Sequence, residues 1–291
     1  MVRRIMTIAL SALVVSSCNQ LDLKGMFMPT GEGVETRFEI SKSFNEDLYS
    51  GTVNTQQEYI FYVAADPHIN ETHANLTTFN DALKNDEVAA FGVILGDCTD
   101  IRDNIQTYMD AFTYNPDSHR FNQKIFHVLG NHDLFFNGWV DFKSNVGPSV
   151  FWFETAFEGG KDLYISLDTA TGTLGRKQSK WFKAFVAENG QNYRHCVILT
   201  HTNLFYTDNS QTSSGNMPLE ETYALIDFLG KQDVTLVLQG HDHYRDDLTY
   251  DGVRYTVLGT IKDEANEPEY LKVTASDNGL ALEWIILSGK Q

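Results

Sequence analysis

Cysteine, basic residues and long apolar runs are all scarce in this chain. Its 291 residues include three cysteines, and 22 lysines and arginines face 39 aspartates and glutamates, which gives a net charge of −17 at pH 7. We expect no long nucleic acid as a partner, because proteins that bind one normally carry a basic patch. A small phosphate-bearing substrate remains possible, because bound cations can invert the local electrostatic potential.

Internal repeats and low-complexity segments are also absent, which excludes a solenoid and argues against a disordered chain. Hydrophobic residues make up 42% of the sequence and aromatic residues 12%. A chain of this length can bury a sizeable core in one large domain or two small ones.

The first twenty residues, "MVRRIMTIALSALVVSSCNQ", combine a basic start with a mostly apolar run over residues 5–15. This run is shorter than the roughly 20 residues of a membrane span, and no later run approaches that length. We therefore predict a signal peptide over residues 1–17. "VSSC" resembles a bacterial lipobox, which implies that Cys18 carries a lipid and tethers the mature chain to the bacterial cell envelope, at the outer membrane or its periplasmic face. The alternative is an ordinary signal peptide in which Cys18 is incidental.

Cys98 and Cys196 are the remaining cysteines. One follows a predicted strand and the other begins a strand parallel to it, so their separation is too large for a disulfide. We expect both to be small buried hydrophobic residues.

The rest of the chain divides near residue 58. Residues 18–57 show no sustained period and are predicted to be a linker or extension with one or two packed pieces, such as "TRFEI". Residues 58–291 are predicted to form the catalytic domain, in which strand-length apolar runs recur and alternate with helical patterns, typical of an α/β fold with a largely parallel sheet. The runs lie at residues 59–65, 88–95, 124–129, 196–200 and 234–238.

Helical spacing of apolar residues predicts helices around Leu76 to Leu83, in "RKQSKWFKAFVAEN" and in "PLEETYALIDFLGKQ". The segments "FWFET…DLYISLD" and "DDLTYDGVRYTVLG" through "LALEWIIL" are instead typical of strands joined by turns, and "YDGV" indicates a hairpin.

Each of the five apolar runs is followed by a potential metal ligand. The motifs are, in chain order, "ADPH", "GDCTD", "GNHD", "THTN" and "GHDH". In open α/β sheets the carboxyl ends of the strands line the crevice where ligands bind, so these motifs are expected to meet at one edge.

Seven side chains in these motifs can bind metal through imidazole or oxygen atoms, without any thiolate. Seven ligands are too many for one ion and suit a pair of cations roughly 4 Å apart that share a carboxylate. Zinc, manganese and iron all fit such mixed nitrogen and oxygen ligands. The seven candidates are Asp66, His68, Asp97, Asn131, His201, His241 and His243.

Each motif taken alone is more typical of a capped turn than of a metal site, and the glycines could be turn residues. Recurrence at five strand ends favours the metal site. Other histidines follow no such strand and are expected to have structural or surface roles; His73 lies near the first loop and stays open. The glycines are Gly96, Gly130 and Gly240, and these histidines are His119, His127 and His195.

As a set, the five motifs resemble those of the calcineurin-like metallophosphoesterases over residues 58–260. The resemblance implies two packed mixed β-sheets flanked by helices in four layers, with a dimetal site at the carboxyl ends of the strands. It also implies two ligand sets that share Asp97. The first ion is held by Asp66, His68, Asp97 and His243, and the second by Asp97, Asn131, His201 and His241.

The implied reaction is hydrolysis of a phosphoester, in which a hydroxide shared by the two ions attacks phosphorus in line. His132, beside Asn131, is the candidate general acid for the leaving alkoxide. In the family the corresponding histidine pairs with the second acid of "GDxxD", which makes Asp100 the expected orienting partner. Asp133 is interpreted either as a site residue or as a loop cap.

The chain departs from the family in two places. The protein phosphatase branch usually carries "DRG" where Asp100, Ile101 and Arg102 stand, which argues against protein substrates. "THTN" also lacks the proline that is common after the fourth motif. Aromatic residues close to the third motif either wall a substrate pocket or pack in the core; they are Phe135, Phe136, Trp139, Phe151, Trp152 and Phe153.

Three functions remain open. The first is an envelope-facing hydrolase that cleaves a small phosphomonoester or phosphodiester. The second is a surface-anchored binding protein that keeps the metallophosphoesterase scaffold without turnover, because a fold does not guarantee activity. The third is a protein that binds phosphate or nucleotides for uptake.

Overall fold

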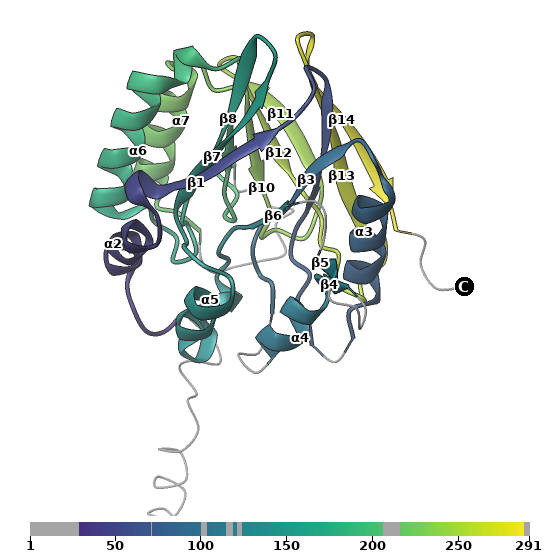
Figure 1. Ribbon diagram of the computed structural model, residues 1–291. Coiled ribbons are helices and arrows are strands. Elements are labelled where there is room, and N and C mark those ends of the chain that lie inside the picture. Colours follow the sequence, from purple (N-terminus) through teal and green to yellow (C-terminus); the bar gives the residue numbers. More distant parts are fainter. Residues whose placement is uncertain are drawn as a thin grey trace, which may run out of the picture.

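Two β-sheets packed face to face and flanked by helices form the molecule (Figure 1). The computed structural model describes residues 29–70, 72–99, 104–114, 119–120, 124–205 and 216–287. The seven-stranded sheet contains, in spatial order, β1 (Tyr49–Asn54), β7 (Phe151–Phe157), β8 (Gly160–Ser166), β9 (Cys196–Leu199), β10 (Leu236–Gln239), β12 (Val253–Val257) and β11 (Asp246–Tyr250). The five-stranded sheet contains β14 (Gly279–Ile286), β13 (Glu269–Ser276), β2 (Tyr59–Ala64), β3 (Ala89–Ile94) and β6 (Lys124–His127).

Both sheets are mixed. In the five-stranded sheet β2 pairs in parallel with β3, and β3 with β6, while β13 runs antiparallel to β2 and to β14. In the seven-stranded sheet β8, β9, β10 and β12 run parallel, and antiparallel strands follow on either side. The predicted α/β sandwich is therefore confirmed. The ligand-bearing strands do not lie in one sheet, however: β2, β3 and β6 belong to one and β9 and β10 to the other.

The main core lies between the sheets and is rich in aromatic residues. Phe91 of β3 meets Phe153 of β7 edge to face with ring centroids 5.3 Å apart, and Phe61 of β2 meets Tyr164 of β8 at 5.5 Å. Such pairs stabilise a core beyond the area they bury. The core fixes the two sheets against each other and so fixes the relative position of their strand ends.

Helices cover the outer face of each sheet. Leu76, Phe79 and Leu83 of α3 are buried against the five-stranded sheet, as their spacing predicts. Phe182 and Leu225, from the two predicted helices between β8 and β10, are buried against the seven-stranded sheet, and Figure 1 shows these helices, α6 and α7, on its outer side. The α-helices among the described residues are α2 (Val34–Phe44), α3 (Ala74–Asn85), α4 (Ile105–Asp110), α5 (Trp139–Asn145), α6 (Gly175–Asn189) and α7 (Leu219–Gly230).

Shorter elements connect these layers. In the described part of the chain the 3-10 helices are η1 (Glu46–Leu48), η3 (His132–Asn137) and η4 (Gly190–Asn192). The strands β4 (Thr113–Tyr114) and β5 (His119–Arg120) pair in a small two-stranded sheet. The predicted "YDGV" hairpin is present between β11 and β12, where Asp251 and Gly252 have φ of 49° and 81°. Positive φ at both central residues is what a tight hairpin turn needs.

The segment before β2 contributes α2 and the edge strand β1, which pairs with β7. Arg37 of α2 is buried and forms a two-pronged ion pair with Asp168, with contacts of 2.8 and 2.9 Å. Phe38 packs on Trp181 of α6. The "TRFEI" piece therefore lies within a helix that is docked on the seven-stranded sheet.

Cys98 and Cys196 are free and buried, so the prediction that they form no disulfide is confirmed. Burial raises the pKa of the Cys196 thiol to about 12 and that of Cys98 well above its usual value. Both thiols are therefore protonated and unreactive at neutral pH.

Candidate metal centre

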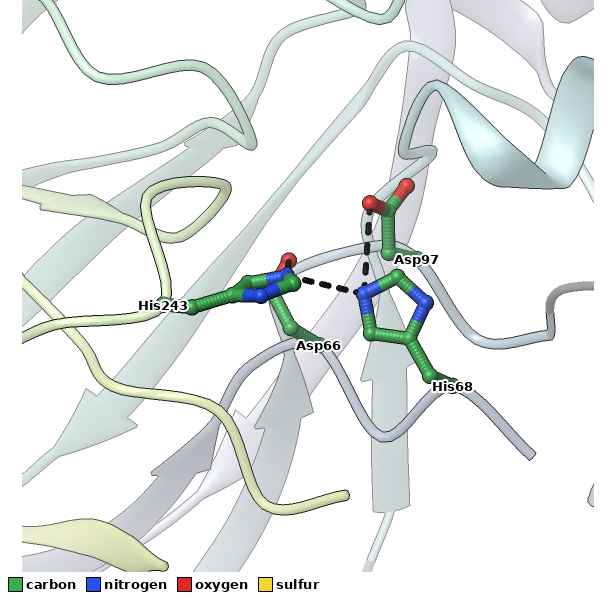
Figure 2. A group of neighbouring side chains, drawn as sticks. All are labelled: Asp66, His68, Asp97 and His243. Atoms are coloured by element: carbon green, nitrogen blue, oxygen red, sulfur yellow. Dashed lines mark hydrogen bonds and ion pairs between the residues drawn. The ribbon is translucent and has the colours of Figure 1, made fainter. Parts of the chain in front are cut away.

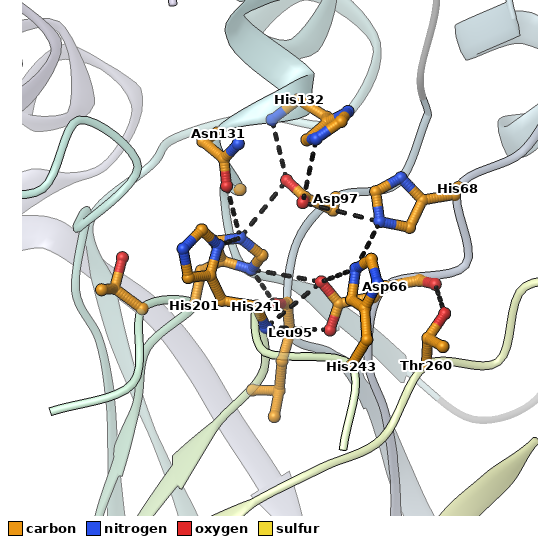
Figure 3. A network of polar contacts seen from close by, with 12 residues as sticks. Asp66, His68, Leu95, Asp97, Asn131, His132, His201, His241, His243 and Thr260 are labelled. Atoms are coloured by element: carbon orange, nitrogen blue, oxygen red, sulfur yellow. Dashed lines mark hydrogen bonds and ion pairs between the residues drawn. The ribbon is translucent and has the colours of Figure 1, made fainter. Parts of the chain in front are cut away.

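The predicted ligands meet at one edge of the sandwich, where the carboxyl ends of strands from both sheets converge (Figure 3). The five-stranded sheet contributes the motifs after β2, β3 and β6, and the seven-stranded sheet those after β9 and β10. Two groups of acidic and imidazole ligand atoms form there, and within each group all the atoms lie within 4.8 Å of one another. Asp97 belongs to both groups.

The first group contains Asp66, His68, Asp97 and His243 (Figure 2). The Nε2 atoms of His68 and His243 are 2.9 Å apart. Nε2 of His68 is 3.7 Å from a carboxylate oxygen of Asp97, and Nε2 of His243 is 3.7 Å from one of Asp66. Two imidazole nitrogens and two carboxylates that face one point form a typical donor set for a divalent cation.

The second group contains Asp97, His201 and His241. Nε2 of His201 lies 3.3 Å from Oδ1 of Asp97 and 3.1 Å from Nδ1 of His241. The amide oxygen of Asn131 lies 2.9 Å from the same nitrogen of His201. Asn131 therefore adds a neutral oxygen donor to this group, so the seven predicted side chains form two clusters joined by Asp97.

The backbone turns sharply at several of these side chains. Five of them have φ between 44° and 76°, in the left-handed region. This conformation costs roughly 1–2 kcal/mol for a residue with a side chain, although aspartate and histidine tolerate it better than most. The strain lets each strand end turn its ligand into the edge of the sandwich; the residues concerned are Asp66, His68, Asp97, His241 and His243.

Two glycines allow the strand ends to approach one another closely. A Cβ atom at Gly130 would lie 2.1 Å from the backbone nitrogen of Asp97, and one at Gly240 would lie 2.7 Å from a carboxylate oxygen of Asp66. Real Cβ atoms do not make such contacts. Both glycines are thus required by the packing of the metal centre and are more than turn residues.

Hydrogen bonds from behind orient the ligands. Nδ1 of His201 lies 2.8 Å from the carbonyl oxygen of Leu95 and donates its proton there, so Nε2 is the nitrogen that faces the second ligand group. The carboxylate of Asp66 accepts the backbone N–H of His241, and the Thr260 hydroxyl donates to the carbonyl oxygen of Asp66 at 2.6 Å. Leu95 and Thr260 thus support the centre, although the five motifs do not include them.

The buried charges of the centre perturb one another. Burial raises the pKa of Asp66 to about 7, and the charge of His201 opposes this increase. Burial also acts to raise the pKa of Asp97, but the charges of His201 and His132 outweigh it and hold that pKa well below its usual value. Burial lowers the pKa of His201, whereas the Asp97 carboxylate raises it, with a net result of about 10. The carboxylates thus stabilise positive charge between them, which is the charge that a divalent cation supplies.

The pKa of His243 shifts in the opposite direction to that of His201. Burial and the nearby His68 lower the pKa of His243 to about 3, so its imidazole is neutral at physiological pH and able to bind metal. Donor type, burial and charge together fit a pair of divalent cations at the two groups.

His132 lies beside the two groups at the start of η3. Its backbone N–H donates to Oδ1 of Asp97 at 2.8 Å, and its Nε2 is 4.0 Å from the other carboxylate oxygen. The ring of Phe135 stacks on the imidazole with centroids 4.4 Å apart. The predicted orienting residue, Asp100, lies outside the described residues.

Asp133 acts as a loop cap. Its carboxylate accepts backbone N–H groups of Cys98 and Gly130 at 2.8 and 2.9 Å, and of Thr99 at 3.3 Å. It therefore joins the second and third motifs from behind. Burial and the charge of Asp97 raise the pKa of Asp133 to about 7.

The other histidines and aromatic residues lie mostly in structural positions. His73 precedes α3, and His195 contacts the carbonyl oxygen of Ser276. His127 is the last residue of β6, and its Nδ1 lies 2.6 Å from the Tyr108 hydroxyl. Of the predicted aromatic cluster, Phe151, Phe153 and Trp139 are buried in the core, while Phe135 contacts His132. The side chain of His119 is not described.

Cys18 and the predicted signal peptide lie outside the described residues. Among the helices that are described, none is both long and apolar enough to cross a membrane.

A sandwich of two mixed sheets whose strand ends carry two ligand groups with a shared carboxylate has the architecture of a dinuclear metallohydrolase. The calcineurin-like phosphoesterase family matches the chain over residues 60–245, and the chain belongs to this family. No curated protein sequence matches the chain.

Solved structures share the fold at low sequence identity. A dimetal phosphatase from Danio rerio has a TM-score of 0.60 at 12% identity and covers 80% of this chain and 99% of its own. GAP50, the anchor in the inner membrane complex of Plasmodium, has a TM-score of 0.60 at 12% identity, and the match covers 81% of this chain and 87% of GAP50. A putative 5′-nucleotidase from Staphylococcus aureus has a TM-score of 0.54 at 14% identity, and the match covers 80% of this chain and 55% of the nucleotidase. Family membership and the two ligand groups support metal-dependent phosphoester hydrolysis.

Proposed function

We propose that the protein hydrolyses a small phosphoester with two divalent cations and with His132 as the general acid. The observation that supports this proposal best is the position of Asp97, whose two carboxylate oxygens face the two ligand groups and which also accepts the His132 N–H at 2.8 Å. One carboxylate thus connects both candidate ion sites and the loop of the acid.

The first cation would bind Asp66, His68, Asp97 and His243, and the second Asp97, Asn131, His201 and His241. Zinc, manganese and iron suit these donors. When bound, the cations supply Lewis-acid charge that activates water as the nucleophile and neutralises the phosphoryl oxygens. The neutral imidazole of His243 and the Nδ1 bond of His201 to Leu95 hold these two rings ready for that role.

His132 would donate the proton that the leaving oxygen needs. Its imidazole is partly exposed, with 32% of its side chain accessible, so substrate can reach it from solvent. The stacked ring of Phe135 and the backbone bond to Asp97 restrict its orientation, and Asp100 is proposed as the further partner. An acid positioned in this way contributes about 10²–10⁴-fold to the rate.

We also propose that Cys18 carries a lipid and holds the mature chain at the bacterial cell envelope. The basic, apolar and small-residue order of the first eighteen residues supports this proposal. Mass spectrometry of the mature protein would detect a diacylated N-terminal cysteine. A soluble Cys18→Ser variant would agree with the anchor, whereas an unmodified cysteine in the wild-type protein would contradict it.

A side-by-side assay tests the hydrolase. The purified chain is loaded in parallel with zinc, manganese or iron, its metal content is measured, and hydrolysis of p-nitrophenyl phosphate and bis(p-nitrophenyl) phosphate is followed. About two cations per chain and turnover of at least one ester are expected, and the preferred ester distinguishes a monoesterase from a diesterase. Two bound cations without turnover of any phosphoester would instead support a binding protein on the same scaffold.

A further inference from the structure

A cavity of about 950 Å³ opens beside His243 on one side of the metal centre. Its wall is the segment between β12 and β13 together with the residues that follow His243. A cavity of this size accommodates the organic part of a substrate. The residues that matter for its chemistry are His243, Arg245, Lys262, Glu264, Glu267 and Glu269.

The wall of this cavity is fixed to the first ligand group. Thr260 donates its hydroxyl to the carbonyl oxygen of Asp66 at 2.6 Å, and the backbone N–H of Ile261 donates to the carbonyl oxygen of Ala65 at 3.1 Å. These bonds join the segment that follows β12 of one sheet to the segment that follows β2 of the other, next to the metal centre. The cavity therefore has a defined position relative to Asp66.

The backbone of Lys262 is held on both sides. Its N–H donates to the Thr260 hydroxyl at 3.1 Å, and its carbonyl oxygen accepts the side-chain amide of Asn75 at 3.0 Å. The next residue, Asp263, accepts the backbone N–H groups of Ala74 and Asn75 at 2.9 and 2.8 Å. A lysine on such a fixed segment loses less conformational freedom when it binds a ligand.

Lys262 also differs from Arg245 in its charge balance. Arg245 forms an ion pair with Glu269 at 3.1 Å and packs over the ring of Trp284. Lys262 is partly buried and forms no ion pair with a carboxylate of any described residue. The Lys262 ammonium is thus available for an anion in the cavity.

The acidic residues that line the cavity are either exposed or paired with Arg245. Glu264 and Glu267 are exposed on the rim, where solvent and salt screen them, and Glu269 is neutralised by Arg245. Partly buried charges are screened less than exposed ones. Lys262 and Arg245 are the basic residues that line this cavity, and only Arg245 is paired with a carboxylate there.

We propose that this cavity receives the organic part of the substrate and that Lys262 binds a second anionic group there, a carboxylate or a second phosphoryl group. Lys262 is then a specificity-determining residue, and the substrate class is phosphoesters that carry a second anionic group besides the reacting phosphoryl group. This inference rests on the proposed function, because the reacting phosphoryl group is assigned to the adjacent metal centre.

Binding of phosphonates to the metal-loaded protein tests the proposal by calorimetry. Three carboxylate compounds, phosphonoacetate, β-phosphonopropionate and γ-phosphonobutyrate, are each compared with the alkylphosphonate of equal chain length. Trimethylenediphosphonate, with propylphosphonate as its reference, supplies a second phosphoryl group instead of a carboxylate. At least one compound with a second anionic group is expected to bind about tenfold more tightly than its alkylphosphonate reference. A hydrogen bond to a charged group provides a gain of this size.

Variants of Lys262 identify the source of this gain. Lys262→Gln is expected to abolish the roughly tenfold gain of each compound over its own alkylphosphonate reference, measured in the same variant. Lys262→Arg should retain most of the gain. The matched control is Lys231→Gln on α7, which removes the same charge from an exposed pair with Asp227 and should keep the full gain.

Two results would overturn the proposal. In the first, no compound with a second anionic group binds more tightly than its alkylphosphonate reference. In the second, the gain in affinity persists in Lys262→Gln. Failure of the proposed function looks different, because a chain that binds phosphonates but hydrolyses no aryl phosphate retains the Lys262 effect in calorimetry. An active enzyme without the Lys262 effect shows the opposite pattern.

Discussion

Asp97 accepts the backbone N–H of His132 at 2.8 Å through the same carboxylate that belongs to both ligand groups. The residue expected to share two cations therefore also holds the loop of the candidate general acid. Any change at Asp97 is expected to act on metal binding and on proton transfer together.

Asp97→Asn is expected to lower metal affinity and turnover by more than about 100-fold, because a neutral amide replaces the shared carboxylate. An amide oxygen still accepts the His132 N–H, so the circular dichroism spectrum should not change. Elemental analysis and kcat on p-nitrophenyl phosphate measure the two effects. Asp227→Asn on the exposed face of α7 is the matched control, and a variant of Asp97 that keeps two cations and full activity would contradict the assignment.

His132→Gln is expected to lower kcat by about 10²–10⁴-fold on alkyl phosphates, whose leaving oxygen needs a proton. The loss should be much smaller on p-nitrophenyl phosphate, because its leaving group is stable as an anion. Metal content should remain that of the wild type. Equal losses on both kinds of ester would show that His132 does not act as the acid.

Gly130→Ala is expected to disrupt the centre, because the new Cβ would lie 2.1 Å from the Asp97 nitrogen. Overpacking of this kind costs about 1–3 kcal/mol of unfolding free energy, and here it also displaces Asp97. Gly33→Ala provides the control, since no atom lies within 4 Å of its added Cβ. Chemical denaturation and metal content of both variants are the measurements, and equal behaviour would refute the close approach.

Arg37→Met is expected to lower the unfolding free energy by about 3–5 kcal/mol, because it leaves the buried Asp168 carboxylate without its partner. Lys161→Met removes an exposed partner of Glu154 and should cost at most about 1 kcal/mol. Urea denaturation of both variants makes the comparison. A small effect at Arg37 would show that α2 contributes little to the stability of the fold.

The buried imidazole of His127 is expected to lower the free energy of unfolding in acid. Burial lowers the pKa of its imidazole from 6.5 to about 4, so the folded state favours the neutral ring. Above pH 6.5 the ring is neutral in both the folded and the unfolded state, so it does not destabilise the fold. As the pH falls from 6.5 to 4, only the unfolded state gains the proton, and the free energy of unfolding falls by at most about 3 kcal/mol. The difference in unfolding free energy between wild type and His127→Gln should therefore shrink across this pH range. A constant difference would contradict the prediction.

The strands, the main helices and the meeting of the motifs at one edge could be predicted from the sequence. Apolar runs of strand length ending in polar motifs were sufficient, because the carboxyl ends of neighbouring parallel strands share an edge. The division of these strands between two sheets could not be predicted from the runs themselves. A strand buried on both faces has the same composition whether helices or a second sheet cover it.

The early helix was missed for a different reason. Its buried positions include Arg37 and Ser41, so polar residues occupy the stripe that apolar residues normally mark. Arg37 is stable there because Asp168 is 131 residues away in sequence but adjacent in space. Thr260 and Lys262 follow β12, which runs parallel to β10 and ends at the same edge, but no metal-binding motif in the sequence marks this strand end.

The origin of the ligands in both sheets has a consequence for how the centre is assembled. Asp66 and His241 are 175 residues apart in sequence, and they meet only when the two sheets have closed on their common core. The complete set of candidate ligands therefore exists only in the finished tertiary structure and belongs to neither half of the chain. Cations bound there would cross-link the halves and secure the open edge of the sandwich, where the hydrophobic core ends.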